Sequence, residues 1–228
     1  MQSDERYSRQ IRFAPIGVEG QGRISASRVA LIGAGALGSV AAELLVRAGV
    51  AYIRIVDRDF VESSNLQRQS LYDEEDVRLN LPKAEAAAGK LRRINSGVQI
   101  ESVVDDVNPS NVEDFIDGVD LVLDALDNFE TRFVLNDACA KQSRTWIYGA
   151  AVGSYGLVMP IMPGRSVTGF SGVPSLSLGT TFITSSSGTA NPMPASCHSN
   201  PAVSVSLDGE IGTMTPITRP SMATSWPP

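Results

Sequence analysis

The segment Gly33-Ala34-Gly35-Ala36-Leu37-Gly38 has a GxGxxG pattern whose residue types suit the binding of a phosphate chain. Glycines at Gly33, Gly35 and Gly38 allow a tight turn and close approach of the backbone to an anion, and unpaired N–H groups at a following helix N-terminus face that anion. Asp57 follows 19 residues after Gly38, a position that suits a carboxylate accepting hydrogen bonds from ribose hydroxyls. Together these residues predict a nucleotide site.

Polar and cationic residues beyond Asp57 favour a triphosphate over a nicotinamide dinucleotide as the nucleotide. Asn65 and Arg68 lie in the segment after Asp57, and Lys83 opens a later helix-forming stretch. Cleavage of a triphosphate requires charge neutralisation at the α-phosphorus and on the departing diphosphate. A nicotinamide enzyme has no evident need for two cations here. The competing interpretation is that Arg68 and Lys83 are ordinary solvated charges.

A third polar group, Asp124-Ala125-Leu126-Asp127-Asn128, follows an apolar strand-like run. Ligands of open parallel sheets collect at the carboxyl ends of the strands. Carboxylate and amide oxygens there suit Mg²⁺, which accompanies nucleotide phosphates. Asp127 is the favoured metal ligand. Asp124 is as well suited to capping the next turn or bonding to the backbone as it is to binding the metal.

Apolar patterning predicts how these residues are positioned. Runs of apolar and β-branched residues predict strands at 29–32, 52–56, 98–104, 120–125 and 145–148, and helical spacing predicts helices at 5–12, 37–48, 83–94, 111–116 and 131–142. Alternation of strands and helices is typical of an α/β, Rossmann-like fold with a mostly parallel sheet and helices on both faces.

The ordered set of motifs resembles the bacterial adenylate-forming enzymes that activate ubiquitin-like sulfur carriers in thiamine and molybdopterin synthesis. The resembling segments are RYSRQ at 6–10, GAGALG at 33–38, DRDFVESSNLQRQ at 57–69, PKA at 82–84 and DALDN at 124–128. The resemblance covers about residues 5 to 163. Each motif is weak alone, but their ordered combination is specific.

The resemblance implies ATP and Mg²⁺ as cofactors and a reaction in which the C-terminal glycine carboxylate of a ubiquitin-like carrier ending in Gly-Gly is adenylated with release of diphosphate. By matched position, Gly35 would lie against the nucleotide, Asp57 would hold its ribose, Asn65, Arg68 and Lys83 would contact its phosphates, and Asp127 would bind Mg²⁺. The resemblance also implies a homodimer in which Arg9 reaches the γ-phosphate in the neighbouring subunit. Arg9, Arg68, Lys83 and Asp127 are thus the expected catalytic residues.

Composition narrows the function classes. The 228 residues carry a formal net charge of −6, which makes a general affinity for nucleic acid or a membrane surface unlikely. The charged N-terminal segment lacks the apolar run of a signal peptide, and two cysteines with one histidine favour a cytoplasmic, reducing setting. Zinc is not predicted, because the two CxxC pairs usual in the resembling family are absent.

The composition changes near residue 164, which divides an ATP-binding domain at 1–164 from a tail at 165–228. The tail holds only 4 of the 44 charged residues, but 13 Ser, 9 Thr and 8 of the 13 Pro. We expect it to be poorly ordered, and to be a divergent or out-of-frame extension. Cys139 is expected to be a buried structural thiol, and Cys197, in the tail, an unactivated one.

Three other functions remain open from the sequence. An ATP-driven dehydratase acting on a tRNA base belongs to the same superfamily, although the acidic balance disfavours it. A nicotinamide-dependent oxidoreductase fits the glycine motif and Asp57, but leaves Arg68, Lys83 and Asp127 unexplained. An inactive nucleotide-binding scaffold is suggested by the unusual C-terminal segment.

Overall fold

The computed structural model describes residues 5–152, 155–163 and 181–184, which lie in the compact unit Met1–Ser186. Its strands are β1 (Arg28–Ile32), β2 (Tyr52–Val56), β3 (Gln99–Val103), β4 (Leu121–Asp124), β5 (Trp146–Val152), β6 (Tyr155–Ile161) and β7 (Thr181–Thr184). Its helices are α2 (Ser8–Ile11), α3 (Gly17–Ile24), α4 (Ala36–Ala48), α5 (Glu74–Arg78), α6 (Lys83–Ile94), α7 (Val112–Ile116) and α8 (Phe129–Lys141), with a 3-10 turn η1 (Ser63–Asn65).

The strands form one sheet in the order β3-β2-β1-β4-β5-β6-β7. β1 to β5 run parallel, and the register places Ile32 of β1 opposite Val56 of β2 and Asp124 of β4. β6 and β7 run antiparallel to their neighbours. The predicted mostly parallel Rossmann-like fold is therefore confirmed, and all five predicted strands are present. β6 and β7 extend the sheet beyond the prediction.

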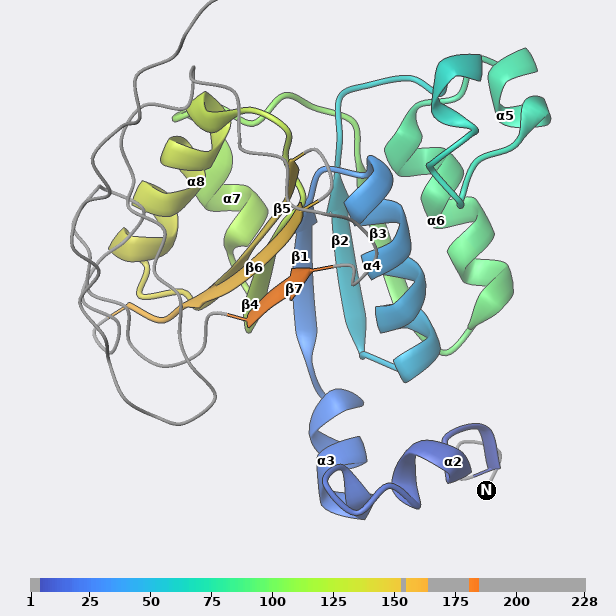
Figure 1. Cartoon of the computed structure of the whole chain (residues 1–228), viewed down its shortest axis with the longest axis vertical. Helices are drawn as coiled ribbons and strands as arrows, with labels where there is room; N and C mark the ends of the chain where they lie inside the picture. The colour runs from blue at the N-terminus through green and yellow to red at the C-terminus, as the bar shows by residue number, and fades with distance from the viewer. Residues whose placement is uncertain (1–4, 153–154, 164–180, 185–228) are drawn as a thin grey trace, which may run out of the picture. The chain divides into compact units, whose positions relative to one another are not determined.

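Helices cover both faces of the sheet (Figure 1). On one face Leu31, Ile53 and Ile55 pack in a cluster with residues of α4 and α6, and on the other face the alternate residues Ala30 and Ile32 pack with residues of α7 and α8. Strands buried on both faces in this way have nearly continuous apolar sequences, which is why β1 and β2, the latter interrupted by Arg54, are recognisable from the sequence.

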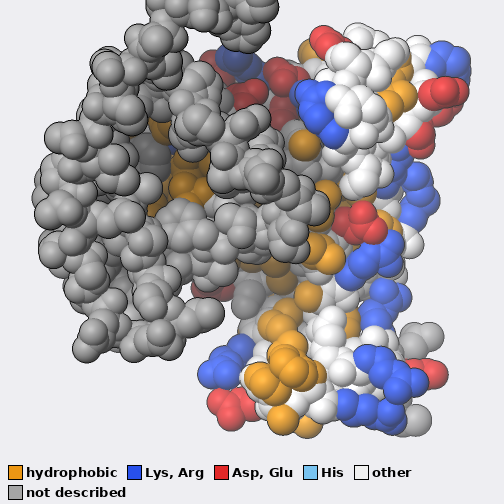
Figure 2. Space-filling model, viewed as in Figure 1, with side chains coloured by type: hydrophobic (Ala, Val, Ile, Leu, Met, Phe, Trp, Pro, Cys, Tyr) orange, Lys and Arg blue, Asp and Glu red, His pale blue; other side chains and the backbone are white. Residues whose placement is uncertain are grey.

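The N-terminal helices lie at the edge of the sheet where β1 begins (Figure 1). α2 corresponds to the helix predicted at 5–12, whereas α3 was not predicted. Gln10 donates hydrogen bonds to Ala48 O at 3.2 Å and to Gln21 Oε1 at 2.7 Å, so α2 and α3 are tied to the end of α4. Figure 2 shows hydrophobic side chains exposed at this end of the molecule, where Phe13 is 60% and Val18 76% exposed.

The predicted tail falls largely on residues outside the described ranges. Of 165–228 the structure describes only Thr181–Thr184, which form β7, and the predicted boundary at residue 164 and the expectation for Cys197 lie outside it. Cys139 is fully buried, as expected, and burial raises the pKa of its thiol to about 12. Within the described part of the chain, no helix has the length and apolar character needed to cross a membrane.

Candidate functional site

The glycine motif forms the turn between β1 and α4, as predicted. Gly33 has a φ of +95°, and a Cβ built on it would lie 2.8 Å from Ala125 O. A Cβ on Gly38 would lie 2.0 Å from Gly33 O. Gly33 and Gly38 are therefore required by the packing of the loop. Gly35 has more room than Gly33 and Gly38. The atom nearest to a Cβ added at Gly35 would be Gln69 Nε2, at 3.9 Å, which leaves space beside the N-terminus of α4.

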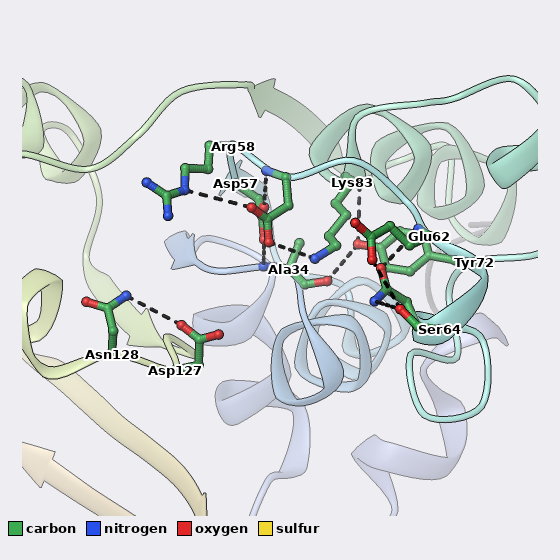
Figure 3. A network of polar contacts seen from close by, with 11 residues as sticks. Ala34, Asp57, Arg58, Glu62, Ser64, Tyr72, Lys83, Asp127 and Asn128 are labelled. Carbon is green, nitrogen blue, oxygen red and sulfur yellow. Dashed lines mark hydrogen bonds and ion pairs between the residues drawn. The ribbon is translucent and has the colours of Figure 1, made fainter.

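Asp57 ties the end of β2 to this loop (Figure 3). Its Oδ2 accepts a hydrogen bond from Ala34 N at 2.6 Å, and its Oδ1 accepts one from Asp59 N at 2.8 Å. Burial raises the pKa of Asp57, and the two backbone N–H donors and the Lys83 cation act against that rise. Asp57 thus fixes the glycine loop through the hydrogen bond from Ala34 N. It lies next to the loop, which is the position expected of a residue that binds the ribose.

Lys83 lies beside Asp57 and is nearly buried, with 7% of its surface exposed. Its Nζ donates to Asp59 Oδ2 at 2.9 Å, and its backbone N donates to Asp59 O at 2.8 Å. The Tyr72 hydroxyl donates to Ala34 O at 2.7 Å, and burial raises the pKa of this phenol. Sequence reasoning missed Asp59 and Tyr72 as parts of the site. The signals for Asp59 were its place two residues after Asp57 and its inclusion in the resembling segment at 57–69.

The segment Asn65–Gln69 forms a short turn at the same edge of the sheet. Asn65 is buried, and its Oδ1 accepts from the N–H of Glu62, the N-cap of η1, at 3.1 Å, so its side chain completes a capping box. Arg68 is exposed, and its Nη1 donates to Ser64 O at 2.9 Å. Gln69, which sequence reasoning also missed, is 4% exposed beside Gly35, and its Oε1 has no hydrogen-bond partner among the described residues.

The two carboxylates after β4 play different parts. Asp124 is 3% exposed, and its Oδ1 accepts from Leu126 N at 2.9 Å, so it has the backbone-bonding role that the sequence left open beside metal binding. Asp127 is exposed, and its Oδ1 accepts from Asn128 Nδ2 at 3.4 Å. Asn128 Oδ1 accepts from Thr131 N at 2.9 Å and caps α8.

One of the carboxylates after β4 suits a metal ion whose remaining ligands come from a bound nucleotide. The described residues contain no group of three or more His, Cys, Asp and Glu side chains able to hold a metal ion. Mg²⁺ bound with nucleotides commonly uses one or two carboxylates and completes its shell with phosphate oxygens and water. Asp127, exposed at the strand ends, fits that pattern, whereas buried Asp124 does not.

The predicted residues lie on both sides of the glycine loop. In Figure 3, Asp57 and Lys83 lie together, while Asp127 and Asn128 lie apart from them, with Ala34 between. No hydrogen bond or ion pair in the described ranges joins Arg68, Lys83 and Asp127 to one another. Their convergence on a phosphate chain stays a prediction. Arg9 is exposed on α2, at the opposite edge of the sheet.

A cavity of about 480 Å³ adjoins Asp127 at the strand ends. Its lining includes Arg58, Val107, Asn108, Pro109, Asp127 and Asn128. Arg58 pairs with Asp106, another lining residue, at 3.1 Å. The cavity therefore lies between the end of β2, the segment after β3 and the loop after β4.

Comparison with known proteins identifies the family. The sequence model described as the ThiF family matches residues 7–200, well over half of the chain. The chain belongs to the ThiF family. The resemblance inferred from the motifs is confirmed, and the ThiF family match begins at residue 7, within the RYSRQ segment whose last three residues lie on α2.

Relatives in the curated set carry names that concern sulfur carriers. The chain is 53% identical over 161 residues to the sulfur carrier protein ThiS adenylyltransferase of Bacillus subtilis, covering 71% of this chain and 48% of that protein. It is 43% identical over 159 residues to the SAMP-activating enzyme E1 of Haloferax volcanii, covering 70% and 58%. The chain thus spans about half the length of these relatives.

Solved structures share the fold at lower identity. A crystal structure of Escherichia coli MccB with ATP matches with a TM-score of 0.64 and 23% identity, covering 70% of this chain and 49% of MccB. A structure of PaaA matches with a TM-score of 0.65 and 24% identity, covering 74% and 57%. These likenesses establish the Rossmann-like architecture.

Proposed function

We propose that this chain is an adenylyltransferase that uses Mg·ATP to activate the C-terminal glycine carboxylate of a ubiquitin-like sulfur-carrier protein. The observation that carries the proposal is the 53% identity to a protein named as a ThiS adenylyltransferase. Asp57, Lys83 and Asp127 support it, because they lie around one glycine loop. They also follow one another along the chain in the order of the family motifs.

ATP would bind across the glycine loop. The open space at Gly35 admits the phosphate chain to the N-terminus of α4, whose free N–H groups favour an anion. The ribose would bind Asp57, and the base would enter the neighbouring cavity of about 480 Å³. Asn65, Arg68 and Lys83 would contact the phosphates. Lys83 would exchange its partner Asp59 for a phosphate oxygen, because both are anionic acceptors within reach of one flexible side chain.

The reaction needs alignment and charge neutralisation more than proton transfer. A carrier carboxylate is already ionised near neutral pH, so no general base has to deprotonate it. Its oxygen would form a bond to the α-phosphorus while the bond from that phosphorus to the bridging oxygen breaks, and diphosphate leaves with the electron pair. Arg68 and Lys83 would stabilise the charge that develops on the leaving group. Mg²⁺, held by Asp127, would neutralise further phosphate charge.

The assembly we propose is a homodimer. Arg9 lies at the edge of the sheet opposite the glycine loop of its own chain, so it would have to serve another subunit's site if it contacts ATP. Its exposed position on α2, which Gln10 ties to the end of α4, supports this assignment. A guanidinium supplied in this way would add positive charge near the γ-phosphate.

Isotope exchange between diphosphate and ATP tests the proposed reaction. We expect exchange in the presence of Mg²⁺ and a ThiS-type carrier with a free C-terminal glycine, and none when the last glycine is removed from the carrier. Absence of exchange with every ubiquitin-like carrier tried would contradict the proposal. ATP binding without exchange would then indicate a scaffold, and preferential binding of NAD would indicate an oxidoreductase.

A further inference from the structure

Arg132, in the second turn of α8, is a buried cation that the proposed reaction does not use. It is 5% exposed. Its Nη2 donates to Leu126 O, within the loop after β4, and to Gly149 O of β5 at 2.8 Å. One guanidinium group therefore joins three parts of the sheet edge: the loop, β5 and α8.

The charge of Arg132 faces a buried carboxylate. Its Nε lies 3.4 Å from Asp124 Oδ2, and neither atom has a hydrogen-bond partner among the described residues. Its guanidinium carbon also lies 4.4 Å from the centre of the Tyr148 ring. A buried cation needs such compensation, since an unpaired charge in the interior is strongly unfavourable. Asp124 and Arg132 thus depend on each other.

These contacts fix the backbone on which Asp127 stands. Leu126 is held from two sides, with its N donating to Asp124 Oδ1 at 2.9 Å and its O accepting from Arg132. One residue beyond Asp127, Asn128 is fixed as the cap of α8, the helix that carries Arg132. The exposed Asp127 side chain has little support of its own, so the backbone on either side sets its position.

We propose that Arg132 is a positioning residue that holds the Asp124–Asn128 loop in the shape that presents Asp127 to the Mg²⁺ of Mg·ATP. This inference rests on the proposed function for the identity of the ligand. Residues that orient a metal ligand from behind typically change metal affinity by about 10–100-fold when they are altered. The planar fork of arginine is essential here, because it reaches two carbonyl oxygens and a carboxylate at once.

Arg132→Lys tests the proposal in the full chain, because lysine keeps the charge and loses the fork. We expect the Mg²⁺ concentration for half-maximal diphosphate exchange to rise by about tenfold, with most of the rate recovered at saturating Mg²⁺. Without nucleotide, we expect the Leu126 amide to exchange with solvent deuterium about tenfold faster or more, because its partner Asp124 loses its own support.

Arg144→Lys is the matched control. Arg144 also donates to a backbone carbonyl, Val119 O, and its Nε is buried without a hydrogen-bond partner in the described part of the chain. It lies just before β5, at the edge of the sheet away from the glycine loop. We expect this variant to lose stability without shifting the Mg²⁺ dependence or the exchange of the Leu126 amide.

Several outcomes would overturn the proposal. An unchanged Mg²⁺ dependence in Arg132→Lys, unchanged exchange at Leu126, or an equal shift in Arg144→Lys would each do so. If Arg132→Lys does not fold, Asp124→Asn replaces it, and we expect a smaller shift in the same direction; no shift overturns the inference. If the wild-type protein exchanges no diphosphate, the proposed function fails, while amide exchange at Leu126 still decides whether Arg132 holds the loop.

Discussion

Lys83 and Asp59 form an ion pair that the bound nucleotide would replace. The Lys83 side chain is nearly buried, whereas that of Asp59 is 54% exposed, so the carboxylate can separate from the ammonium at little cost. We expect Lys83→Gln to lower carrier-dependent diphosphate exchange by about 10²–10³-fold, because one stabilising cation is lost from the transition state.

Asp59→Asn is the matched comparison for Lys83→Gln, since it changes the other member of the same pair. We expect it to lower exchange by less than about tenfold, because Asp59 neutralises Lys83 only while the site is empty. The measurement is the exchange rate at saturating ATP and carrier. Equal losses in the two variants would mean that the ion pair itself, rather than the lysine, is required.

The three glycines of the loop should respond differently to an added methyl group. We expect Gly38→Ala to destabilise the protein by about 2 kcal/mol or more, since its Cβ would overlap Gly33 O. Gly35→Ala should change the free energy of unfolding by less than about 1 kcal/mol, because the nearest atom of a described residue, Gln69 Nε2, lies 3.9 Å from the added carbon. It should nevertheless weaken ATP binding at least about tenfold by occupying the phosphate space.

Urea unfolding and calorimetric titration with ATP separate these two effects. We expect the Gly35→Ala protein to combine normal stability in urea with reduced affinity for ATP. Normal ATP affinity in that variant would show that the phosphate chain does not pass over Gly35.

Among the helices, α2 is the element whose role depends on a second subunit. Gln10 donates to Ala48 O, and the Tyr7 hydroxyl accepts from Asn95 Nδ2 at 2.9 Å, so the helix is anchored on both sides. Arg9, on the same helix, is exposed. This arrangement orients Arg9 without involving it in the packing of its own chain.

Mixed dimers test whether Arg9 acts across the subunit interface. Arg9→Ala and Lys83→Gln proteins should each be inactive, whereas mixing and reassembly should give about a quarter of the wild-type exchange rate, because each mixed dimer then has one complete site. The measurement is diphosphate exchange after joint refolding. No recovery, in the presence of demonstrated mixed dimers, would place Arg9 in the site of its own chain or outside any site.

The stability of the chain as a whole should depend on the ionisation of Asp124. Burial raises the pKa of this carboxyl from 3.8 to about 6, against the effects of the Leu126 N–H and Arg132. The folded protein therefore binds this proton more tightly than the unfolded chain. The contribution of Asp124 to the free energy of unfolding is fully present below about pH 4 and is lost as the pH rises through 6.

We expect the wild type to gain about 1 kcal/mol relative to Asp124→Asn when the pH falls from 7 to 5. Guanidinium unfolding of both proteins at the two pH values measures the difference, and other titrating groups cancel in the comparison. A relative gain in stability for the wild type at the higher pH would show that Arg132 dominates over burial and keeps Asp124 ionised.

There are physical reasons why α3, β6 and β7 were not predicted from the sequence. α3 contains Gly17, Gly20 and Gly22, which give little helical signal, and it is held by contacts such as Gln21 Nε2 to Ala48 O at 3.1 Å. β6 contains Pro160, an unusual residue within a sheet. Among the described residues β7 pairs with Tyr155–Val158, and the strand that pairs with β6 at Pro160 is β5.

Side-chain partners were harder to predict than side-chain chemistry. Asn65 was predicted to contact phosphate, and in the structure its side chain accepts a hydrogen bond from the backbone of Glu62, the N-cap of η1. Tyr72 carried no recognisable pattern, and Gln69 was recognised only as the last residue of the resembling segment at 57–69. The place of both residues in the site comes from contacts with Ala34 and Gly35, more than 30 residues earlier in the chain. Local spacing contains no information on such pairs.

The order of apolar runs, the glycine turn and the carboxylates at strand ends were determined by the sequence, because each depends on neighbours within about one turn or one strand. The tertiary structure decided which charges are partnered. It paired Lys83 with Asp59, buried Asp124 against Arg132 and left Asp127 exposed. The difference between Asp124 and Asp127 follows from burial, which depends on the sheet and helices that pack around each carboxylate.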